Sequence, residues 1–349
     1  MNTPGFADLF ARYPPWVAPL GEIEALGGAG GLSGARLYRH LSAGGRLATR
    51  RWPDAGPDQA RLRLIHGWLA RAADLEFIPN PIPDQKGATL QIWAGGLWEV
   101  APWLEGKAHL VHPPDQKHLV AAATALARFH TRLADLSESG RSPGLKRRLD
   151  TVFALLGGGF DLLEAAVQQA STRSSADLDD RAARWLHDAR ALAPLLVDPL
   201  SRAADRVTPL APCLRDARPE HFLFLEAPSG PRVSGLVDFG AMDVDSVAGD
   251  LARLFSAGRV PAGPARSAAI DAYRAIRPLK PEQVDLIASF EQSAALLGGE
   301  RWIRWHYLEG RHFDDPGAAA DGLRRALERL TWLAKEGLGP GLAAARLHR

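Results

Sequence analysis

Short apolar runs separated by glycine-containing turns dominate the first hundred residues of this 349-residue chain. Runs of this kind, bounded by turn residues, are typical of antiparallel hairpins. The predicted strands lie at residues 22–26, 35–41, 46–52, 89–93 and 97–103. A short helix is expected within residues 6–20. Residues 57–75 place Leu62, Ile65 and Leu69 on one face, which predicts an amphipathic helix.

From residue 115 onward the hydrophobic positions recur mainly with helical spacing. The predicted helices lie at residues 115–136, 265–276, 281–297, 299–312 and 316–335, with two more between 160 and 207. The stretch SESGRSPG at 137–144 and the three glycines at 157–159 predict a loop over residues 138–159. Strands followed by helices indicate an α+β chain, long enough for two domains or two lobes.

One hairpin stands apart, because an aspartate lies at each of its ends. Asp216 precedes the two β-prone runs at 222–226 and 232–237, and Asp238 follows directly after the second run. We expect the hairpin to bring the two carboxylates close together. Phosphoryl transfer needs such a pair, one to accept a proton from a hydroxyl and one to hold a metal ion. The alternative is that both aspartates only cap turns.

The same stretch resembles the catalytic core of the aminoglycoside phosphotransferase and choline kinase-like family. That family typically shows His-Gly-Asp, four residues, Asn, then a hairpin, Ile-Asp-Trp/Phe-Gly and Asp-Leu-Ala. Here the corresponding residues are Leu214-Arg215-Asp216, His221, Val237-Asp238-Phe239-Gly240 and Asp250-Leu251-Ala252. The order and the spacing both agree, whereas Leu214 and His221 depart from the family pattern.

This resemblance implies a protein-kinase-like, two-lobe α+β fold with a small antiparallel-sheet lobe and a mainly helical lobe. We expect a nucleotide-binding lobe at residues 1–104 and a helical lobe at residues 105–349. The helical lobe would carry the catalytic loop at 213–221 and the metal motif at 237–240.

The resemblance also assigns roles to the polar residues of this core. Asp216 would orient and deprotonate the acceptor hydroxyl, and Arg218 would stabilise the charge of the transferring phosphoryl group. Asp238, with His221 as second ligand, would hold Mg²⁺ against the phosphates of ATP. Asp250, placed early in a predicted helix, is expected to accept backbone N–H bonds and hold the catalytic loop.

The predicted nucleotide site begins at the glycine-rich turn between the first two strands. Glycines let backbone N–H groups approach phosphate oxygens. The residues expected to contact phosphates in this turn are Gly30, Gly31, Ser33 and Gly34. The alternative is a flexible hairpin loop without a ligand.

By the same resemblance, Arg50 reaches the phosphates from the third strand and Ala48 faces the base. Two residues apart on a strand, these side chains share a face. Val100 and Trp103 belong to the expected hinge beside the adenine. In kinase-like proteins the helix at 57–75 supplies a glutamate that pairs with the strand cation. It contains none here, and His66 within it is expected to pack or to lie at the surface.

The acceptor is expected to be a small polar molecule with a hydroxyl group, such as an aminoglycoside, an amino alcohol or a sugar-like compound. Trp302, Trp305 and Tyr307 either line a pocket for it or pack the core of the lobe. A net charge of +2 without a clustered basic stripe argues against a nucleic-acid partner. The oligomeric state has no signature in the sequence.

The single cysteine, Cys213, excludes an internal disulfide and fits a reducing compartment. No apolar run reaches 18 residues and no signal-peptide pattern begins the chain, so we expect no membrane association and a cytoplasmic location. A second function stays open. Leu214, His221 and the missing helix glutamate also suit a weak or inactive kinase-like protein that binds a nucleotide or a partner.

Overall fold

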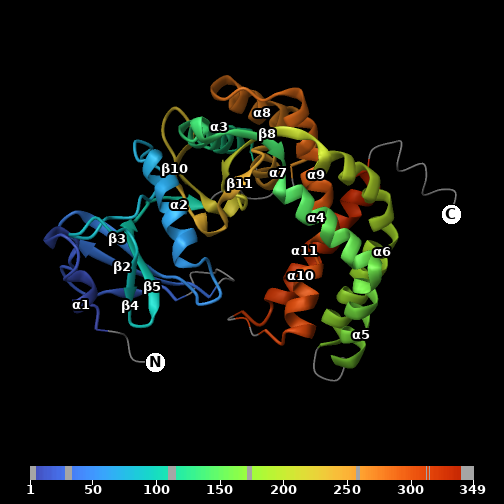
Figure 1. Ribbon diagram of the computed structural model, residues 1–349, viewed down its shortest axis with the longest axis horizontal. Helices are drawn as coiled ribbons and strands as arrows, with labels where there is room; N and C mark the ends of the chain where they lie inside the picture. The colour runs from blue at the N-terminus through green and yellow to red at the C-terminus, as the bar shows by residue number, and fades with distance from the viewer. Residues whose placement is uncertain are drawn as a thin grey trace. The chain divides into compact units, whose positions relative to one another are not determined.

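The computed structural model describes residues 5–27, 34–108, 115–170, 175–256, 260–311, 313 and 315–338. The chain divides into two compact units. The N-terminal unit comprises Met1–Leu136, Arg218–Asp243 and Ala269–Arg277. The C-terminal unit comprises Ser137–Ala217, Val244–Ala268 and Pro278–Arg349. Both units are therefore built from segments that are far apart in the sequence (Figure 1). The simpler division at residues 1–104 and 105–349 stays a prediction.

The N-terminal unit contains two antiparallel sheets. Its strands are β1 (Glu24–Ala25), β2 (Arg36–Ser42), β3 (Gly45–Arg51), β4 (Gln91–Trp93), β5 (Gly96–Pro102), β6 (Lys107–Ala108), β9 (Phe222–Leu225) and β10 (Arg232–Leu236). Its helices are α1 (Ala7–Phe10), α2 (Gln59–Arg71) and α3 (Gln116–Arg132). The first sheet has the order β1-β2-β3-β5-β4, and the second has the order β10-β9-β6. Each predicted strand of the first hundred residues is present.

Aromatic side chains form the core beside one face of the first sheet. Phe6 packs edge-on against Tyr38 and Trp98, with ring centroids 4.9 and 5.8 Å apart. Leu47 from β3 and Val100 from β5 are buried in the same cluster. Alternation along β3 therefore leaves Ala48 and Arg50 on the opposite face, as the sequence predicted.

Helix α2 is stabilised by an N-cap at its start and by a row of apolar side chains that it buries. The Asp58 side chain accepts a hydrogen bond from the backbone N–H of Arg61 at 2.8 Å, which satisfies one of the donors left open at a helix start. Leu62, Ile65 and Leu69 are buried, as predicted. The helix lies beside the first sheet (Figure 1), and its buried His66 contacts β5.

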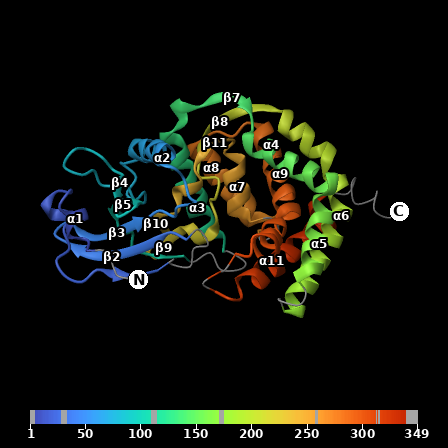
Figure 2. The same cartoon turned by 60° about the horizontal axis from the view of Figure 1, so that its bottom comes forward.

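The rest of the chain is mainly helical and carries a third sheet, in the order β11-β8-β7. The strands of this sheet are β7 (Glu138–Arg141), β8 (Val207–Cys213) and β11 (Asp243–Asp245). The helices are α4 (Pro143–Ala154), α5 (Phe160–Ala170), α6 (Ala176–Asp205), α7 (Ala248–Phe255), α8 (Pro264–Ile276), α9 (Pro281–Leu297), α10 (Glu300–Ile303) and α11 (Ala318–Trp332). Within the C-terminal unit, α6 packs against α4, α5, α9 and α11 (Figure 2).

The loop predicted at residues 138–159 is wrong, since this segment forms strand β7 and helix α4. Ser142 caps α4 by accepting a bond from the backbone N–H of Leu145 at 3.1 Å, and Pro143 occupies the first turn, where its missing N–H costs nothing. Only Gly157 and Gly158 leave the helical conformation. The glycines mark a kink between α4 and α5, and the irregular segment is confined to this kink and does not extend back over α4.

Two other predicted helices are shorter than expected. The helix expected within residues 6–20 is limited to α1, which ends at Phe10, and a single 3-10 turn at Pro15–Val17. The helix expected at 299–312 is α-helical only over α10, followed by a π-helical turn at Arg304–Leu308. Among the described residues, no helix combines the length and the apolar character needed to cross a membrane.

A glycine contact tests the packing of the C-terminal unit. A Cβ atom on Gly299 would lie 2.5 Å from the indole ring of Trp185, which is fully buried. We expect Gly299→Ala to lower the free energy of unfolding by about 1–3 kcal/mol, because the ring cannot move aside. Gly157→Ala is the control, since nothing lies within 4 Å of its Cβ position. Urea denaturation measures both, and equal stabilities of the two variants would contradict this packing.

Candidate active site

The predicted hairpin is present as β9 and β10 in the N-terminal unit. Phe222 pairs with Leu236 and Leu225 pairs with Arg232, with a bulge between Val233 and Gly235. A 3-10 turn at Pro219–His221 leads into β9, and Asp238 follows shortly after β10. Three predicted site residues, Arg218, His221 and Asp238, therefore belong to one unit.

Asp238 sits in a left-handed backbone conformation with φ of 67°. A residue other than glycine is rarely found there, and such strain is often kept at functional sites. Its side chain is 52% exposed, and its Oδ2 lies 3.5 Å from Nε2 of the buried His221. Arg218 donates from Nη2 to the same His221 Nε2 at 3.1 Å. Nε2 of His221 thus accepts a hydrogen bond from Arg218 and lies next to the position of any cation that Asp238 binds.

The loop that carries Asp216 belongs to the C-terminal unit, where a buried carboxylate holds it. Asp250, fully buried on α7, accepts the backbone N–H of Leu214 and the backbone N–H of Arg215, both at 2.7 Å. This confirms the predicted role of Asp250. Leu214, which replaces the family's histidine, is itself fully buried and contributes apolar packing to the loop.

Asp216 follows Arg215, whose φ of 63° turns the chain sharply. Asp216 Oδ1 accepts Nε of Arg253 from α7 at 2.8 Å, and Nη2 of the same guanidinium lies 2.8 Å from it. A charge-assisted contact of this length fixes the orientation of a carboxylate. Since Asp250 and Arg253 both come from α7, one helix positions both the loop and its aspartate. The proximity of Asp216 to Asp238 stays a prediction.

The strand cation of the N-terminal unit has a partner that sequence analysis missed. Arg50 on β3 lies directly opposite Glu99 on β5, with Nε 3.7 Å from Oε1. The other oxygen of Glu99 accepts Nε1 of Trp52 and contacts Nε2 of His66, both at 2.9 Å. His66 in turn contacts the Thr89 hydroxyl through Nδ1 at 2.8 Å. Helix α2 therefore contributes an imidazole, and the carboxylate comes from the sheet.

Burial alone would raise the pKa of the Glu99 carboxyl, since only 8% of the residue is exposed. The contacts from His66, Arg50 and Trp52 outweigh this effect and lower the pKa of Glu99 below its ordinary value. Glu99 is thus a buried anion held by three partners. The register of β3 and β5 is the signal that identifies it, because residues directly opposite on antiparallel strands share a face.

Not all of the predicted nucleotide contacts fall within the described part of the chain. Gly30, Gly31 and Ser33 lie outside the described residues, and Gly34 has the left-handed φ of 79° that glycine tolerates best. The Val100 side chain is fully buried in the aromatic cluster, and its carbonyl accepts the backbone N–H of Ile82 at 2.7 Å.

Ala48 shares its face with Arg50 and lies opposite Ala101, so small side chains line the sheet there. Trp103 follows β5, and its ring lies under the guanidinium of Arg39 at 4.9 Å. Ala48 and Trp103 are half-buried, whereas the Val100 side chain is fully buried. Contact of these residues with a nucleotide stays a prediction.

The aromatic residues near the C-terminus pack on one another. The Trp302 and Trp305 rings are 5.6 Å apart, and Phe313 lies within 6.0 Å of both. The guanidinium of Arg311 covers Trp305 at 4.3 Å, and the Tyr307 hydroxyl donates to Asp179 at 2.6 Å. All three aromatic residues of the prediction are half-buried, so they both pack and face solvent.

The sequence matches a known protein family over most of its length. The sequence model of the phosphotransferase enzyme family matches residues 24–287. The chain belongs to this family. No curated protein matches the chain in sequence.

Solved structures of low sequence identity share the fold. The aminoglycoside phosphotransferase of Alicyclobacillus acidocaldarius is 18% identical, covers 99% of this chain and 97% of its own, and gives a TM-score of 0.56. Spectinomycin phosphotransferase is 11% identical over 97% and 98% of the two chains, with a TM-score of 0.59. The choline kinase of Streptococcus pneumoniae is 13% identical over 93% and 97%, with a TM-score of 0.54. The fold is the protein-kinase-like, two-lobe α+β fold.

The two hydrogen bonds that Asp250 accepts from the backbone of Leu214 and Arg215, which we call the Asp250 clamp, should contribute to the free energy of unfolding. Asp250→Asn replaces one acceptor oxygen by an N–H₂ group that faces a backbone donor. We expect a loss of about 2–4 kcal/mol in the free energy of unfolding, because a buried donor is left unsatisfied. Asp198→Asn is the control, an exposed aspartate on α6 that should change stability by less than about 0.5 kcal/mol. Equal stabilities by urea denaturation would argue against the clamp.

The lowered pKa of Glu99 predicts a pH effect. A carboxylate with a depressed pKa stabilises the native state above its ordinary pKa of 4.5, and this contribution fades as the pH falls through the native value. At pH 7, Glu99→Gln should cost about 1.5–3 kcal/mol. The difference from wild type should shrink as the pH falls below 4.5. A pH-independent difference would contradict the ionised state of Glu99, and the exposed Glu22→Gln serves as control.

Proposed function

We propose that this protein is an ATP-dependent phosphotransferase that moves the γ-phosphoryl group to a hydroxyl of a small polar molecule. The observation that carries the proposal is the α7 clamp on the catalytic loop. Asp250 bonds two successive backbone N–H groups and Arg253 orients Asp216. This arrangement orients the aspartate that phosphoryl transfer requires, although Leu214 replaces the family's histidine.

A divalent cation fits the residues around Asp238. Magnesium at nucleotide sites takes one or two carboxylates together with phosphate oxygens and water. The half-exposed Asp238 carboxylate offers such a ligand, and His221 Nε2 lies 3.5 Å from it. When bound, the cation neutralises the charge on the β- and γ-phosphates. Structures of the family's relatives agree with nucleotide use: spectinomycin phosphotransferase was solved with ADP, and amicoumacin kinase with AMP-PNP and Ca²⁺.

The chain's own residues then divide the work. Asp216 accepts the proton of the acceptor hydroxyl while the hydroxyl oxygen of the acceptor forms a bond to the γ-phosphorus of ATP. The bond between the γ-phosphorus and the β–γ bridging oxygen breaks, which releases ADP. Arg218 stabilises the negative charge of the transferring group, and Arg50 grips the phosphates with its direction set by Glu99. Catalysis of this kind depends mainly on positioning and electrostatics.

The proposed acceptor class is supported by solved structures that share this fold and not by a pocket of this chain. Proteins with this fold include kinases of choline, aminopropanol and aminoglycosides. We therefore propose an amino alcohol, an aminoglycoside or a sugar-like acceptor. The domain division at residues 1–104 and 105–349 is part of the proposal. A cytoplasmic location suits the use of ATP and the buried free thiol of Cys213.

One observation favours the alternative of a weak or inactive nucleotide-binding protein. His221 Nε2 already accepts Arg218 at 3.1 Å, which reduces its value as a metal ligand and keeps a cation close to the metal position. If this contact persists with nucleotide bound, metal affinity will depend on Asp238 and on the phosphates alone.

Two aspartate variants test the assignment. Asp238→Asn should abolish the Mg²⁺-dependent rise in thermal midpoint that ATP produces, because the metal loses its carboxylate. Asp216→Asn should keep that rise and lose about 10³-fold or more in turnover, measured as ADP release with a panel of amino alcohols, aminoglycosides and sugars. Asp198→Asn is again the control.

Two results would count against the proposal. Full turnover by Asp216→Asn would remove this residue from the mechanism. Binding of Mg²⁺ and ATP by the wild type without phosphoryl transfer to any acceptor of the panel would favour the binding protein.

A further inference from the structure

A small pocket in the C-terminal unit is lined by three arginines. Arg147 and Arg148 come from α4, and Arg215 comes from the catalytic loop. The pocket has a volume of about 140 Å³. A cavity of about 150 Å³ admits a benzene-sized molecule, so this space suits one compact ligand and is too small for a nucleotide. We call it the arginine pocket.

Arg148 is the unusual member, because its contacts are all with neutral groups. Its Nη1 donates to the carbonyl of Phe290 at 2.6 Å and to the hydroxyl of Ser293 at 3.0 Å. Its guanidinium also lies 5.1 Å from the centre of the Phe290 ring. No carboxylate of the described residues forms an ion pair with Arg148.

A buried carboxylate in this unit, Glu291, does have a counter-ion. Glu291, with 2% of its side chain exposed, receives both terminal nitrogens of Arg266 at 2.9 and 2.6 Å. Arg148 is half-buried, and partial removal of a charge from water is unfavourable when no opposite charge lies beside it. Arg148 thus lacks the ion pair that Glu291 has in the same unit.

The neighbouring charges increase this imbalance. Burial, together with the guanidiniums of Arg253 and Arg215, lowers the pKa of Arg148 to about 10, and Asp245 only partly opposes them. At neutral pH Arg148 is still charged. The pocket thus keeps a cation in surroundings that penalise it.

The two carboxylates of the arginine pocket are already engaged. Both oxygens of Asp250 accept backbone N–H groups of the catalytic loop. Asp245 accepts the Ser142 hydroxyl at 2.5 Å and its neighbour's backbone N–H at 2.9 Å, and it lies 3.7 Å from Arg215. The pocket therefore contains three guanidiniums and only two carboxylates, and both carboxylates already accept hydrogen bonds from the protein.

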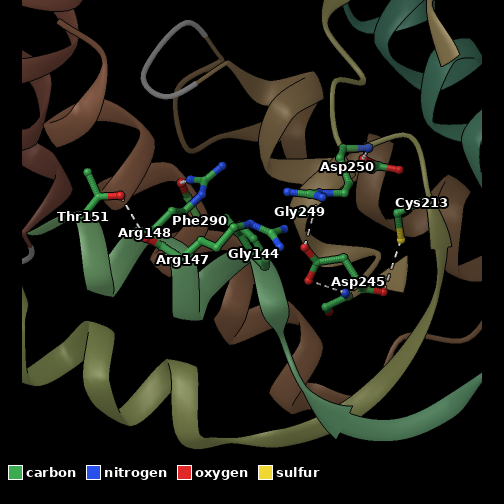
Figure 3. A pocket seen from close by; sticks show the side chains of 11 residues that line it. Gly144, Arg147, Arg148, Thr151, Cys213, Asp245, Gly249, Asp250 and Phe290 are labelled. Carbon is green, nitrogen blue, oxygen red and sulfur yellow. Dashed lines mark hydrogen bonds and ion pairs between the residues drawn. The ribbon is translucent and has the colours of Figure 1, made fainter. Parts of the chain in front are cut away.

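The backbone leaves the space open. Figure 3 shows Arg147 reaching from α4 toward Asp245, with Gly144 and Gly249 at the edges of the pocket. A Cβ atom on Gly144 would lie 2.2 Å from Asp245 Oδ2, and one on Gly249 would lie 3.2 Å from the Phe290 ring. Side chains at these positions would fill the volume in which a ligand would meet the arginines.

We propose that the arginine pocket binds a compact oxyanion, of the class of inorganic phosphate or sulfate, as the counter-ion of Arg148. Planar guanidinium groups bind tetrahedral oxyanions by paired hydrogen bonds. Because Arg215 lines the pocket and directly precedes Asp216, a bound anion also stabilises the catalytic loop. The pocket shares no residue with the proposed nucleotide contacts, and the proposal does not depend on them.

The test is a titration of the full-length protein with inorganic phosphate, against potassium chloride at equal ionic strength. We expect phosphate to raise the thermal midpoint by about 2 °C or more at saturation, since it binds the native state. Arg148→Met and Arg147→Ala should lose this rise. Arg202→Ala, an exposed arginine of α6, and Arg50→Ala should keep it. If Arg148→Met fails to fold, the exposed Arg147 variant decides.

The outcomes separate this site from the nucleotide site. A phosphate effect that is lost in Arg50→Ala and retained in Arg147→Ala and Arg148→Met would place the anion at the nucleotide site and overturn the proposal. Absence of any effect of phosphate or sulfate in the wild type would also overturn it. A retained phosphate effect in a protein that does not respond to ATP and Mg²⁺ would overturn the proposed kinase function alone.

Discussion

The buried carboxylate of Asp250 is the interaction on which the catalytic loop depends. A carboxylate without solvent is costly unless its oxygens are satisfied. Two successive backbone N–H groups satisfy it here, those of Leu214 and Arg215. The loop in turn obtains partners for two backbone donors that no strand or helix could serve. The loop therefore satisfies the Asp250 carboxylate, and the carboxylate satisfies two backbone donors of the loop. This contact holds the loop segment that directly precedes Asp216.

A second buried carboxylate organises the N-terminal unit in a similar way. Glu99 forms an ion pair with Arg50 of β3, accepts a hydrogen bond from Trp52 after that strand, and contacts His66 of α2. The family resemblance implies a glutamate on this helix, whereas here the helix supplies an imidazole and the carboxylate comes from β5. The exchange is physically reasonable, because a carboxylate on β5 opposite Arg50 needs a donor on its far side and a histidine can provide one.

Several charged groups of the described residues that lie away from solvent have hydrogen-bond partners. Glu99 and Glu291 each have an arginine partner, and Asp250 accepts two backbone N–H groups. Arg148 is hydrogen-bonded as well, but only to a carbonyl and a hydroxyl, and no carboxylate of the described residues forms an ion pair with it. The arginine pocket adjoins the loop that carries Asp216 through Arg215.

The sequence by itself determined the strands of the first sheet, most of the helices, the hairpin between Asp216 and Asp238, and the role of Asp250. These features depend on local periodicity, turn residues and the order of motifs, all of which are written along the chain. Its main error, the loop at 138–159, arose because a glycine kink at Gly157 and Gly158 hid the N-cap at Ser142. Only the tertiary structure decided that Glu99 pairs with Arg50, that Arg253 orients Asp216, and that Arg148 has neutral partners. Those contacts join residues 37 to 142 positions apart or on opposite strands, and their selection depends on register and packing, which no local pattern specifies.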